Sequence, residues 1–419
     1  MSLRINKETI FFASIMLMLI FLDSQYMPGA NVPVLFLVTN ILYGKRFSLL
    51  KGRMIKLFLC FVFYLLAITL INITSNYDLS NSIMYFIEIA IIFISCSAAL
   101  YGIDVRKFMQ LMRNVGIFLG VLGIIEGIIQ YPFFTVALKL TGATAYDPNG
   151  YRVVSIFAHP IVSGVLFMFC WGALLIMPFK KFSVNFIAHA ILMTVIVLTR
   201  SRSVWLSFAA IVGIFFIKKL SQSEHKISKK YIQRFALLVL LVLLVDAATG
   251  FHASGNIYEF FRSRIVGSLY AGEGAGNIIR IDTVLNSINY WKDGNLDKFL
   301  FGMGKNYDKY FMQLFPVIKY STVWTAAIDN QYFTTIHEAG IIGFILIIAI
   351  LICALKRIVK ANKNEKVKLI VNSSIVSVYV SNYFYEGLNY MSVLTILVVL
   401  MAISDMCERK NDENMYCST

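Results

Sequence analysis

Arginines standing apart from the basic connectors are the side chains of this chain best suited to chemistry on a phosphate. An arginine fork makes paired hydrogen bonds to phosphate oxygens and stays charged at every physiological pH. The structural alternative is an arginine that reaches to lipid headgroups or pairs within the protein. Arg200 and Arg202 are two residues apart, so on a helix we expect at most one of them to face a substrate. The arginines in question are Arg152, Arg200, Arg202, Arg262, Arg264 and Arg280.

Proton transfer requires a second kind of residue. Asp329 directly precedes an apolar run. It could act on an acceptor hydroxyl, or it could cap a helix by accepting from the amide of Tyr332 or its neighbour. His337 and Glu338 lie further into the same run, where buried polar packing or pairing with an arginine is the expected role. His159, directly before Pro160, suits a helix cap as well as a sugar contact. The full set of candidates is His159, His252, Asp329, His337 and Glu338.

The composition places these residues in a membrane protein. Of the 419 residues, 58% are hydrophobic and only 15% are charged, and the mean hydropathy is +0.72. Soluble globular domains carry about 25% charged residues, so an ordinary soluble fold is excluded. The net charge of +15 would suggest nucleic acid in a soluble protein. Here the basic residues cluster in short connectors, which membrane orientation explains better, and we expect no nucleic-acid partner.

Several kinds of active site are excluded by missing motifs. The chain has no Walker A sequence, no Asp-x-Asp pair of nucleotide-sugar enzymes, no His-Glu-x-x-His and no Gly-x-Ser-x-Gly. None of the six cysteines lies between residues 250 and 329, and no CxxC pair occurs. We therefore expect no cofactor, no metal site and no disulfide framework. The stretch Gly302-Met303-Gly304 is too short for a phosphate cradle and predicts a turn.

Apolar runs divide the chain into about twelve predicted spans, each near the ~20 residues that cross a bilayer. The division is residues 1–249 for spans one to nine, 250–329 for an extracytoplasmic loop, 330–406 for spans ten to twelve, and 407–419 for a cytoplasmic tail. The predicted fold is an all-α polytopic membrane protein with a large helical loop. The spans are roughly 9–27, 30–44, 54–73, 82–101, 114–134, 157–177, 183–199, 203–218, 233–249, 331–355, 367–385 and 388–405.

Charge along the connectors predicts the orientation. Lysine and arginine concentrate in alternate connectors, such as residues 45–56 and 356–368, whereas residues 72–81 and 386–389 contain none. The positive-inside rule then places both termini in the cytoplasm and residues 250–329 outside.

Within the predicted loop, apolar residues recur at helical spacing over residues 281–291 and 307–314. Glycines punctuate these stretches, so we expect two or three short amphipathic helices lying over the membrane face. Glu126 lies inside an apolar run between Gly123 and Gly127. It could be protonated and hydrogen-bonded, pair with an arginine, or couple ions in a transporter.

Four ordered stretches carry a family resemblance. They run from Arg152 to Pro160 with Gly164; from Leu198 to Leu206; from Arg280 to Trp291 with Asp293, Phe301, Gly302 and Gly304; and over Asn330, Tyr332, Glu338, Gly340 and Gly343. In this order and topology they resemble the O-antigen ligase and Wzy-type polymerase superfamily. Each motif is weak alone, and the ordered set is fairly specific.

The resemblance implies a metal-independent glycosyltransferase whose donor is a glycan on a polyprenyl diphosphate. Arginines matching Arg202 and Arg280 would engage the diphosphate. The position of the ligase branch's histidine holds Asp329, which fits the polymerase branch better. The implied catalytic residues are Arg280, Arg202 and Asp329. Beyond what the resemblance implies, we predict a set of substrate-binding residues: Arg152, His159, Arg200, Arg264, Tyr332, His337 and Glu338.

We therefore predict a polymerase that joins lipid-linked repeat units on the outer face of the bacterial plasma membrane, for O-antigen, capsule or exopolysaccharide. One alternative is a ligase that moves finished polymer to a lipid or protein acceptor. The other is a flippase or transporter that catalyses no glycosyl transfer. Expected partners are the lipid-linked oligosaccharide, membrane lipid and a candidate chain-length regulator protein.

Overall fold

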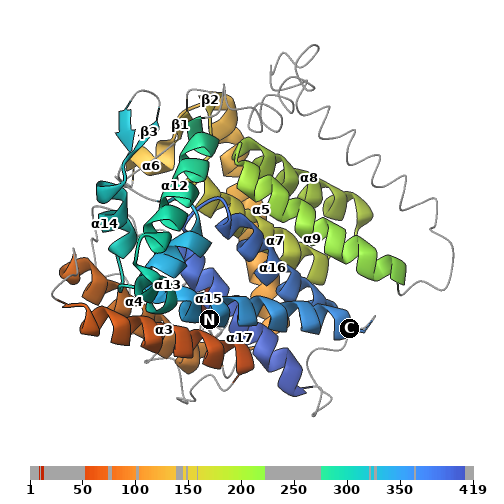
Figure 1. The fold of residues 1–419 in the computed structure, drawn as a ribbon. Helices are drawn as coiled ribbons and strands as arrows, with labels where there is room; N and C mark the ends of the chain where they lie inside the picture. The colour runs from red at the N-terminus through yellow and green to blue at the C-terminus, as the bar shows by residue number, and fades with distance from the viewer. Residues whose placement is uncertain are drawn as a thin grey trace.

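The computed structural model describes residues 9, 11–13, 52–73, 78–100, 103–137, 145–147, 150–157, 159–221, 275–319, 322–324, 328–362 and 365–410. These segments are almost entirely helical (Figure 1). The helices are α3 (Arg53–Ile71), α4 (Leu79–Leu100), α5 (Val105–Ile129), α6 (Phe133–Ala137), α7 (Pro160–Ile176), α8 (Phe182–Leu198), α9 (Arg202–Ser221), α12 (Ala275–Lys292), α13 (Leu296–Phe301), α14 (Tyr307–Leu314), α15 (Gln331–Lys360), α16 (Lys366–Asn382), η3 (Gly387–Asn389) and α17 (Met391–Lys410).

Two small antiparallel hairpins interrupt the helices, and the sequence patterns predicted neither. The first pairs β1 (Tyr146–Asp147) with β2 (Gly150–Tyr151), and the second pairs β3 (Val317–Lys319) with β4 (Thr322–Trp324). Strands of two or three residues are too short to show an alternating pattern of apolar and polar positions.

Five of the described helices are long and apolar enough to cross a membrane: α3, α4 over Leu79–Ser97, α5, α15, and α17 over Met391–Glu408. Helices α7 and α8 are apolar but shorter. The five long helices, together with α7, α8, α9 and α16, overlap nine of the twelve predicted spans. The first two spans and the ninth fall outside the described residues, apart from residues 9 and 11–13. The fold is that of a helical membrane protein, and the number twelve stays a prediction.

The central helix of the bundle, α16, is unusually polar for its position. It packs against α7, α9, α15 and α17, and 15 of its 17 residues are buried. Its polar side chains bond carbonyls of its own preceding turn, as in Asn372 Nδ2 to Lys368 O at 2.7 Å and Ser373 Oγ to Leu369 O at 2.8 Å. A polar group satisfied within its own helix can be buried among apolar neighbours, which explains the position of this helix.

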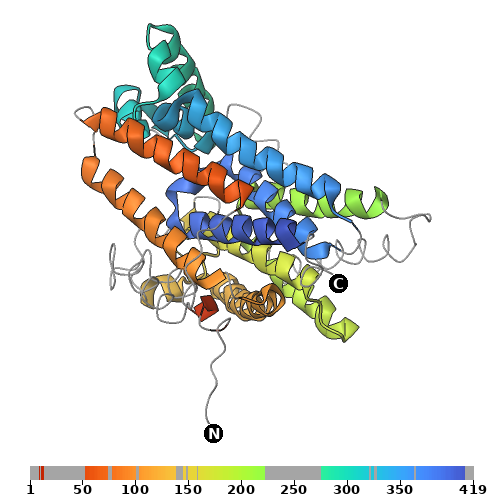
Figure 2. The same cartoon turned by 90° about the horizontal axis from the view of Figure 1, so that it is seen from below.

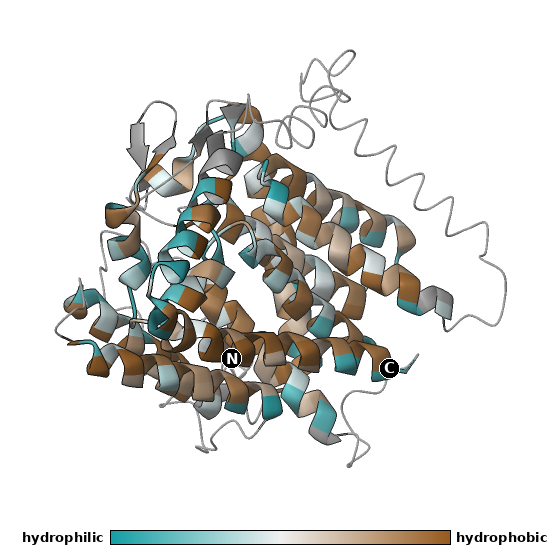
Figure 3. Cartoon of the chain, viewed as in Figure 1, coloured by the Kyte–Doolittle hydropathy of each residue, from teal (hydrophilic) through white to brown (hydrophobic). Residues whose placement is uncertain are grey.

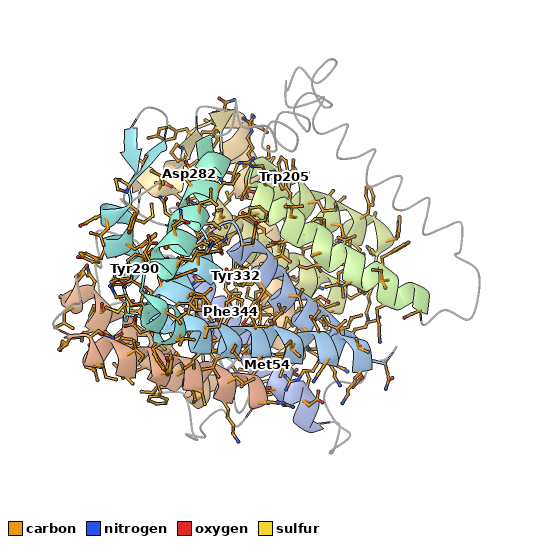
Figure 4. All side chains as sticks on the ribbon, in the orientation of Figure 1. Met54, Trp205, Asp282, Tyr290, Tyr332 and Phe344 are labelled. Carbon is orange, nitrogen blue, oxygen red and sulfur yellow. The ribbon has the colours of Figure 1, made fainter. Side chains whose placement is uncertain are left out.

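One end of the bundle gathers basic residues that the sequence assigns to cytoplasmic connectors. There the buried carboxylate of Asp405 accepts from the amides of Met54 and Ile55 at 3.3 and 3.1 Å and from Arg357 at 2.6 Å. Lys368 lies 3.3 Å from Glu408 at the same end. Figure 4 labels Met54 near this end of α3, away from Trp205 near the start of α9.

The opposite end, called the loop end below, is where residues 301–306 pack on the membrane helices. Lys305 N donates to Thr69 Oγ1 of α3 at 2.9 Å, and its carbonyl accepts from Ser82 Oγ of α4 at 3.1 Å. Hydrophilic residues are prominent on α12 to α14, whereas α3, α8 and α15 are mostly apolar (Figure 3). The described part of the predicted loop thus contains three helices beside the β3–β4 hairpin.

Helix α15 is kinked at Gly340, whose backbone is far from helical at φ 63° and ψ −172°. The kink directs the carbonyls of His337 and Glu338 to partners outside the helix. They accept from Met303 N at 3.0 Å and Gly304 N at 2.8 Å. The turn predicted over residues 302–304 is therefore a strap that holds the loop to α15.

Candidate functional site

The first feature of the loop end is a junction between two of the sequence stretches, those around Arg152 and around Arg200. Val153 N donates to Leu198 O at 3.0 Å, so the segment after β2 runs beside the end of α8. The Arg152 side chain reaches the same place, with Nε donating to Thr199 O at 3.3 Å. Residues 45 and 47 positions apart in sequence thereby share one site, which is called the arginine junction below.

The α8–α9 turn that completes the arginine junction lies between the predicted spans 183–199 and 203–218. Arg200 has a left-handed backbone, φ 48°, and lies between the two helices, while Arg202 is the first residue of α9. The two arginines therefore do not share one helix, so the argument that a helix would point them in different directions does not apply to the pair. Thr199 Oγ1 donates to Ile196 O at 2.7 Å, and Ser201 and Ser203 share a hydroxyl hydrogen bond of 2.8 Å. These short polar residues satisfy the tight turn locally.

Glu126 supports the arginine junction from beneath. Its side chain is fully buried, and Oε1 accepts from Tyr151 OH at 2.8 Å and from Val154 N at 2.9 Å. These donors lie on either side of Arg152. Of the three roles considered for Glu126, its observed geometry is that of the hydrogen-bonded carboxyl. A Cβ on Gly123 or Gly127 would stand 3.3 or 3.2 Å from a Val153 methyl, so the flanking glycines let this segment approach.

His159 lies between the arginine junction and the α16–α17 connection. It caps α7, with Nδ1 accepting from Ile161 N at 3.2 Å, so the cap considered for this residue is confirmed. Burial, and then the positive charge of Arg152, lowers the pKa of His159 to about 3. The imidazole is therefore neutral at neutral pH. Its ring centroid lies 5.6 Å from that of Tyr390, the residue directly before α17.

The connection between α16 and α17, residues 383–390, joins the arginine junction to the end of the loop. Tyr390 contacts His159 on one side, and Glu386 accepts from Ile328 N at 3.0 Å on the other. Leu388 is tied at both backbone groups: its amide donates to Gln331 Oε1 at 2.8 Å, and its carbonyl accepts from Tyr85 OH at 3.3 Å. Sequence reasoning noted only that this connector lacks basic residues. Its clustered tyrosines and single glutamate were the available signal.

Asp329 occupies a left-handed position, φ 55°, at the last turn before α15. The helix cap considered for it belongs to the next residue. Asn330 Oδ1 accepts from Tyr332 N at 3.0 Å and Phe333 N at 3.4 Å. Because Asn330 supplies the capping oxygen, the cap interpretation of Asp329 is wrong.

Tyr332, in the first turn of α15, is tied into the helix bundle (Figure 4). Its hydroxyl donates to the Tyr379 carbonyl of α16 at 2.6 Å, and its ring packs edge-on against Phe344. The structure therefore gives Tyr332 a packing role at the loop end. A sugar contact by this residue stays a prediction.

His337 and Glu338 are both buried and hold the loop rather than the arginine junction. His337 Nε2 shares a 2.9 Å hydrogen bond with Ser287 Oγ of α12, and its ring lies 4.1 Å from that of Phe311 of α14, centroid to centroid. Glu338 Oε1 accepts from Lys305 Nζ at 2.6 Å and Asn306 N at 2.8 Å. Buried polar packing was expected for both, and the cation paired with Glu338 is a lysine rather than an arginine.

The remaining predicted residues are only partly placed. Arg262, Arg264 and His252 fall outside the described residues, as does the side chain of Arg280. The backbone of Arg280 lies in the N-terminal third of α12. In Figure 1 this helix lies near the start of α9, whereas the two helices stand apart in Figure 2. The described residues therefore join Arg152 to the Arg200–Arg202 turn, and the meeting of Arg280 with that turn stays a prediction.

Comparison with known protein families gives a match to the part of the chain that contains most of these residues. The family described as O-antigen ligase matches residues 187–348, from α8 to the middle of α15. This range includes Arg202, Arg280, Asp329 and Glu338, while Arg152 precedes it. A search of curated proteins found no match to the chain. Residues 187–348 of this membrane protein are therefore similar to the O-antigen ligase family, as the ordered sequence motifs predicted.

Proposed function

We propose that this protein is a polysaccharide polymerase that transfers a growing glycan between polyprenyl-diphosphate carriers. The observation that carries the proposal is the arginine junction. Arg152 and the Arg200–Arg202 turn are joined by two hydrogen bonds, Val153 N to Leu198 O and Arg152 Nε to Thr199 O. Three arginines gathered at one end of a membrane bundle suit a diphosphate held at the lipid headgroup level.

In the proposed reaction, the hydroxyl of the acceptor sugar attacks the anomeric carbon of the donor. The bond from that carbon to the diphosphate oxygen breaks, and lipid diphosphate leaves with the electron pair. Arg202 and Arg280 stabilise the charge that develops on the departing diphosphate, and Arg152 holds the donor or acceptor. Asp329 orients the acceptor hydroxyl and takes its proton as the new glycosidic bond forms.

The proposal includes a location and partners. The protein would be a multi-pass protein of the bacterial plasma membrane, with both termini in the cytoplasm and the loop end outside. Its substrate would be a polyprenyl-diphosphate-linked oligosaccharide, and a chain-length regulator is a candidate partner. The segregation of basic residues at the end opposite the loop supports this orientation.

A ligase is the second candidate, because the matched family is described as O-antigen ligase. Asp329, at the position where the ligase motif has histidine, favours the polymerase. Deletion of the gene separates the two. Loss of a polymerase leaves single repeat units on their final acceptor, whereas loss of a ligase leaves long polymer on the lipid carrier. A flippase instead predicts carrier-linked units trapped on the inner leaflet.

The direct test is elongation of a lipid-linked repeat unit by purified protein. We expect Arg202→Ala to lower kcat by about 10²–10³-fold, as for removal of one charged donor in an oxyanion site. Arg202→Lys should recover only part of this loss, because lysine keeps the charge without the planar fork. Arg106→Ala is the matched control, since Arg106 lies at the start of α5, at the opposite end from the arginine junction. An Arg202→Ala protein that builds long polymer at the wild-type rate would contradict the proposal.

A further inference from the structure

Glu386 is a buried carboxylate in the α16–α17 connection that the proposed reaction leaves unused. The residue is only 8% exposed. Oε1 accepts from Ile328 N at 3.0 Å and from Thr334 Oγ1 at 2.8 Å, while Oε2 accepts from Asn389 Nδ2 at 2.9 Å. Three donors on one carboxyl group, two from around the start of α15 and one from the same connection, make a specific clamp rather than incidental packing.

Two of those donors enclose Asp329 in the sequence. Ile328 directly precedes it, and Thr334 lies in the first turns of α15. Asp329 itself has a left-handed backbone, φ 55°, which a non-glycine residue adopts only when its surroundings hold it there. The cap formed by Asn330 fixes the start of the helix, with Tyr332 N 3.0 Å from Asn330 Oδ1. By its bond to Ile328 N, Glu386 therefore determines how the backbone at Asp329 enters α15.

The far side of Glu386 is held equally firmly. Asn389 can present its amide hydrogens to Glu386 because its Oδ1 accepts from Lys305 Nζ at 2.7 Å. Lys305 in turn pairs with Glu338 at 2.6 Å. The contacts that run from Glu338 of α15 through Lys305 to Asn389 therefore fix the orientation of the Glu386 side chain. The charged groups that act on it are Asp308 of α14 and Asp329.

We propose that Glu386 is the positioning residue for Asp329. By holding the residues on both sides of Asp329, its carboxyl group fixes the direction in which the Asp329 side chain meets the acceptor hydroxyl. This inference rests on the proposed role of Asp329 in the transfer reaction. A displacement of about 1 Å in a reacting group can cost as much as 10²-fold in rate, so a clamp at this place would matter for kcat.

The test measures elongation by the purified full-length protein, with lipid-linked repeat unit as donor and acceptor. We expect Glu386→Ala to lower kcat by about 10–100-fold, with KM for the lipid-linked unit changed less than about threefold. Thr334→Val, which removes one donor while keeping the side-chain volume, should lower kcat in the same way to a smaller extent. Thr395→Val is its matched control, because that buried hydroxyl bonds only the Met391 carbonyl of its own helix, at 2.7 Å.

A double-substitution cycle separates positioning from general stability. Asp329→Glu moves the carboxylate by one methylene, so Asp329 is already misplaced in that background. We expect Glu386→Ala to lower the residual rate of Asp329→Glu by less than about twofold. If the rate losses of Asp329→Glu and Glu386→Ala multiply in full in the double variant, Glu386 acts independently of Asp329. That result would overturn the inference. Gel filtration in detergent checks folding, and Thr334→Val carries the test if Glu386→Ala does not fold.

The outcomes distinguish this inference from the proposed function. If Asp329→Asn is inactive while Glu386→Ala and Thr334→Val are fully active, the inference fails and the proposed function stands. If Asp329→Asn elongates at the wild-type rate, the proposed role of Asp329 fails, and the inference fails with it. Loss of kcat in all three variants, with the non-additive cycle, supports both.

Discussion

At the scale of single residues, two buried glutamates organise the loop end. Glu126 accepts from donors on either side of Arg152, and Glu386 accepts from donors on either side of Asp329. In each case a buried glutamate from another part of the chain holds a short stretch of backbone in one conformation. Such a stretch has few hydrogen bonds of its own, so a side chain must supply them.

The stability of the protein should depend on the ionisation of Glu386. Burial, then the negative charge of Asp308, raises the pKa of Glu386 to about 8 from an ordinary 4.5. The native state therefore binds this proton more tightly than the unfolded state does. The resulting stabilisation is full below about pH 4.5 and is lost as the pH rises through 8. We expect the melting temperature in detergent to fall between pH 5 and pH 8.

Glu386→Gln is the control for that pH dependence, because glutamine keeps an acceptor for Ile328 and Thr334 but does not titrate. Its melting temperature should vary less over pH 5–8 than that of the wild type. An unchanged slope in the variant would assign the pH dependence to other groups.

At the scale of elements, the kink in α15 decides where the loop attaches. A straight helix would use the His337 and Glu338 carbonyls internally, but the kink presents them to Met303 N and Gly304 N. The backbone at Gly340, φ 63° and ψ −172°, lies in a region that essentially only glycine adopts. One glycine thus converts a membrane helix into a docking site for the strap.

Gly340→Ala should destabilise the protein strongly. The new Cβ would collide with the Leu300 carbonyl, and the backbone strain adds to this overpacking. Together these effects should cost roughly 3 kcal/mol or more. The measurement is thermal unfolding in detergent with limited proteolysis of the loop.

The matched control is Gly213→Ala in α9, where an added Cβ meets nothing within 4 Å. In a helix interior this change should be neutral or stabilise by about 0.4–1 kcal/mol. Equal losses in the two variants would show that the kink has no special requirement for glycine.

At the scale of the whole molecule, Lys305 joins the loop to the membrane helices. It is 3% exposed, and its ammonium contacts Glu338, Asn389 and the ring of Tyr85, whose centroid is 4.6 Å away. Burial alone would lower the pKa of Lys305, but the charge of Glu338 outweighs it and the pKa is raised. The lysine is therefore charged, and a single residue links three helices and the α16–α17 connection.

Lys305→Met should be more destabilising than the pair Lys305→Met with Glu338→Gln. The single change leaves a buried carboxylate without its cation, at a cost of about 3–5 kcal/mol, whereas the pair leaves no net charge. The readouts are the melting temperature and the rate of proteolytic cleavage in the loop. Lys309→Met, on the partly exposed side of α14, is the control and should stay within about 0.5 kcal/mol of wild type. A double variant as unstable as the single one would contradict this account.

Sequence alone determined the class of the protein, because apolar runs of membrane length and the positions of basic residues are local properties. Composition and run length predicted the helical membrane fold, and nine of the described helices overlap predicted spans. The ordered motifs from Arg152 to Gly343 indicated the family whose match covers residues 187–348. Local patterns also suggested helices over residues 281–291 and 307–314, where α12 and α14 lie.

Only the tertiary structure decided which polar residues meet. Lys305 has no motif, yet it is the partner of Glu338, and Glu386 holds Ile328 from 58 residues away in sequence. The cap of α15 fell to Asn330 rather than Asp329 because the chain turns through a left-handed residue immediately before the helix. Such contacts depend on how distant segments cross at the loop end, and no periodicity within either segment encodes that crossing.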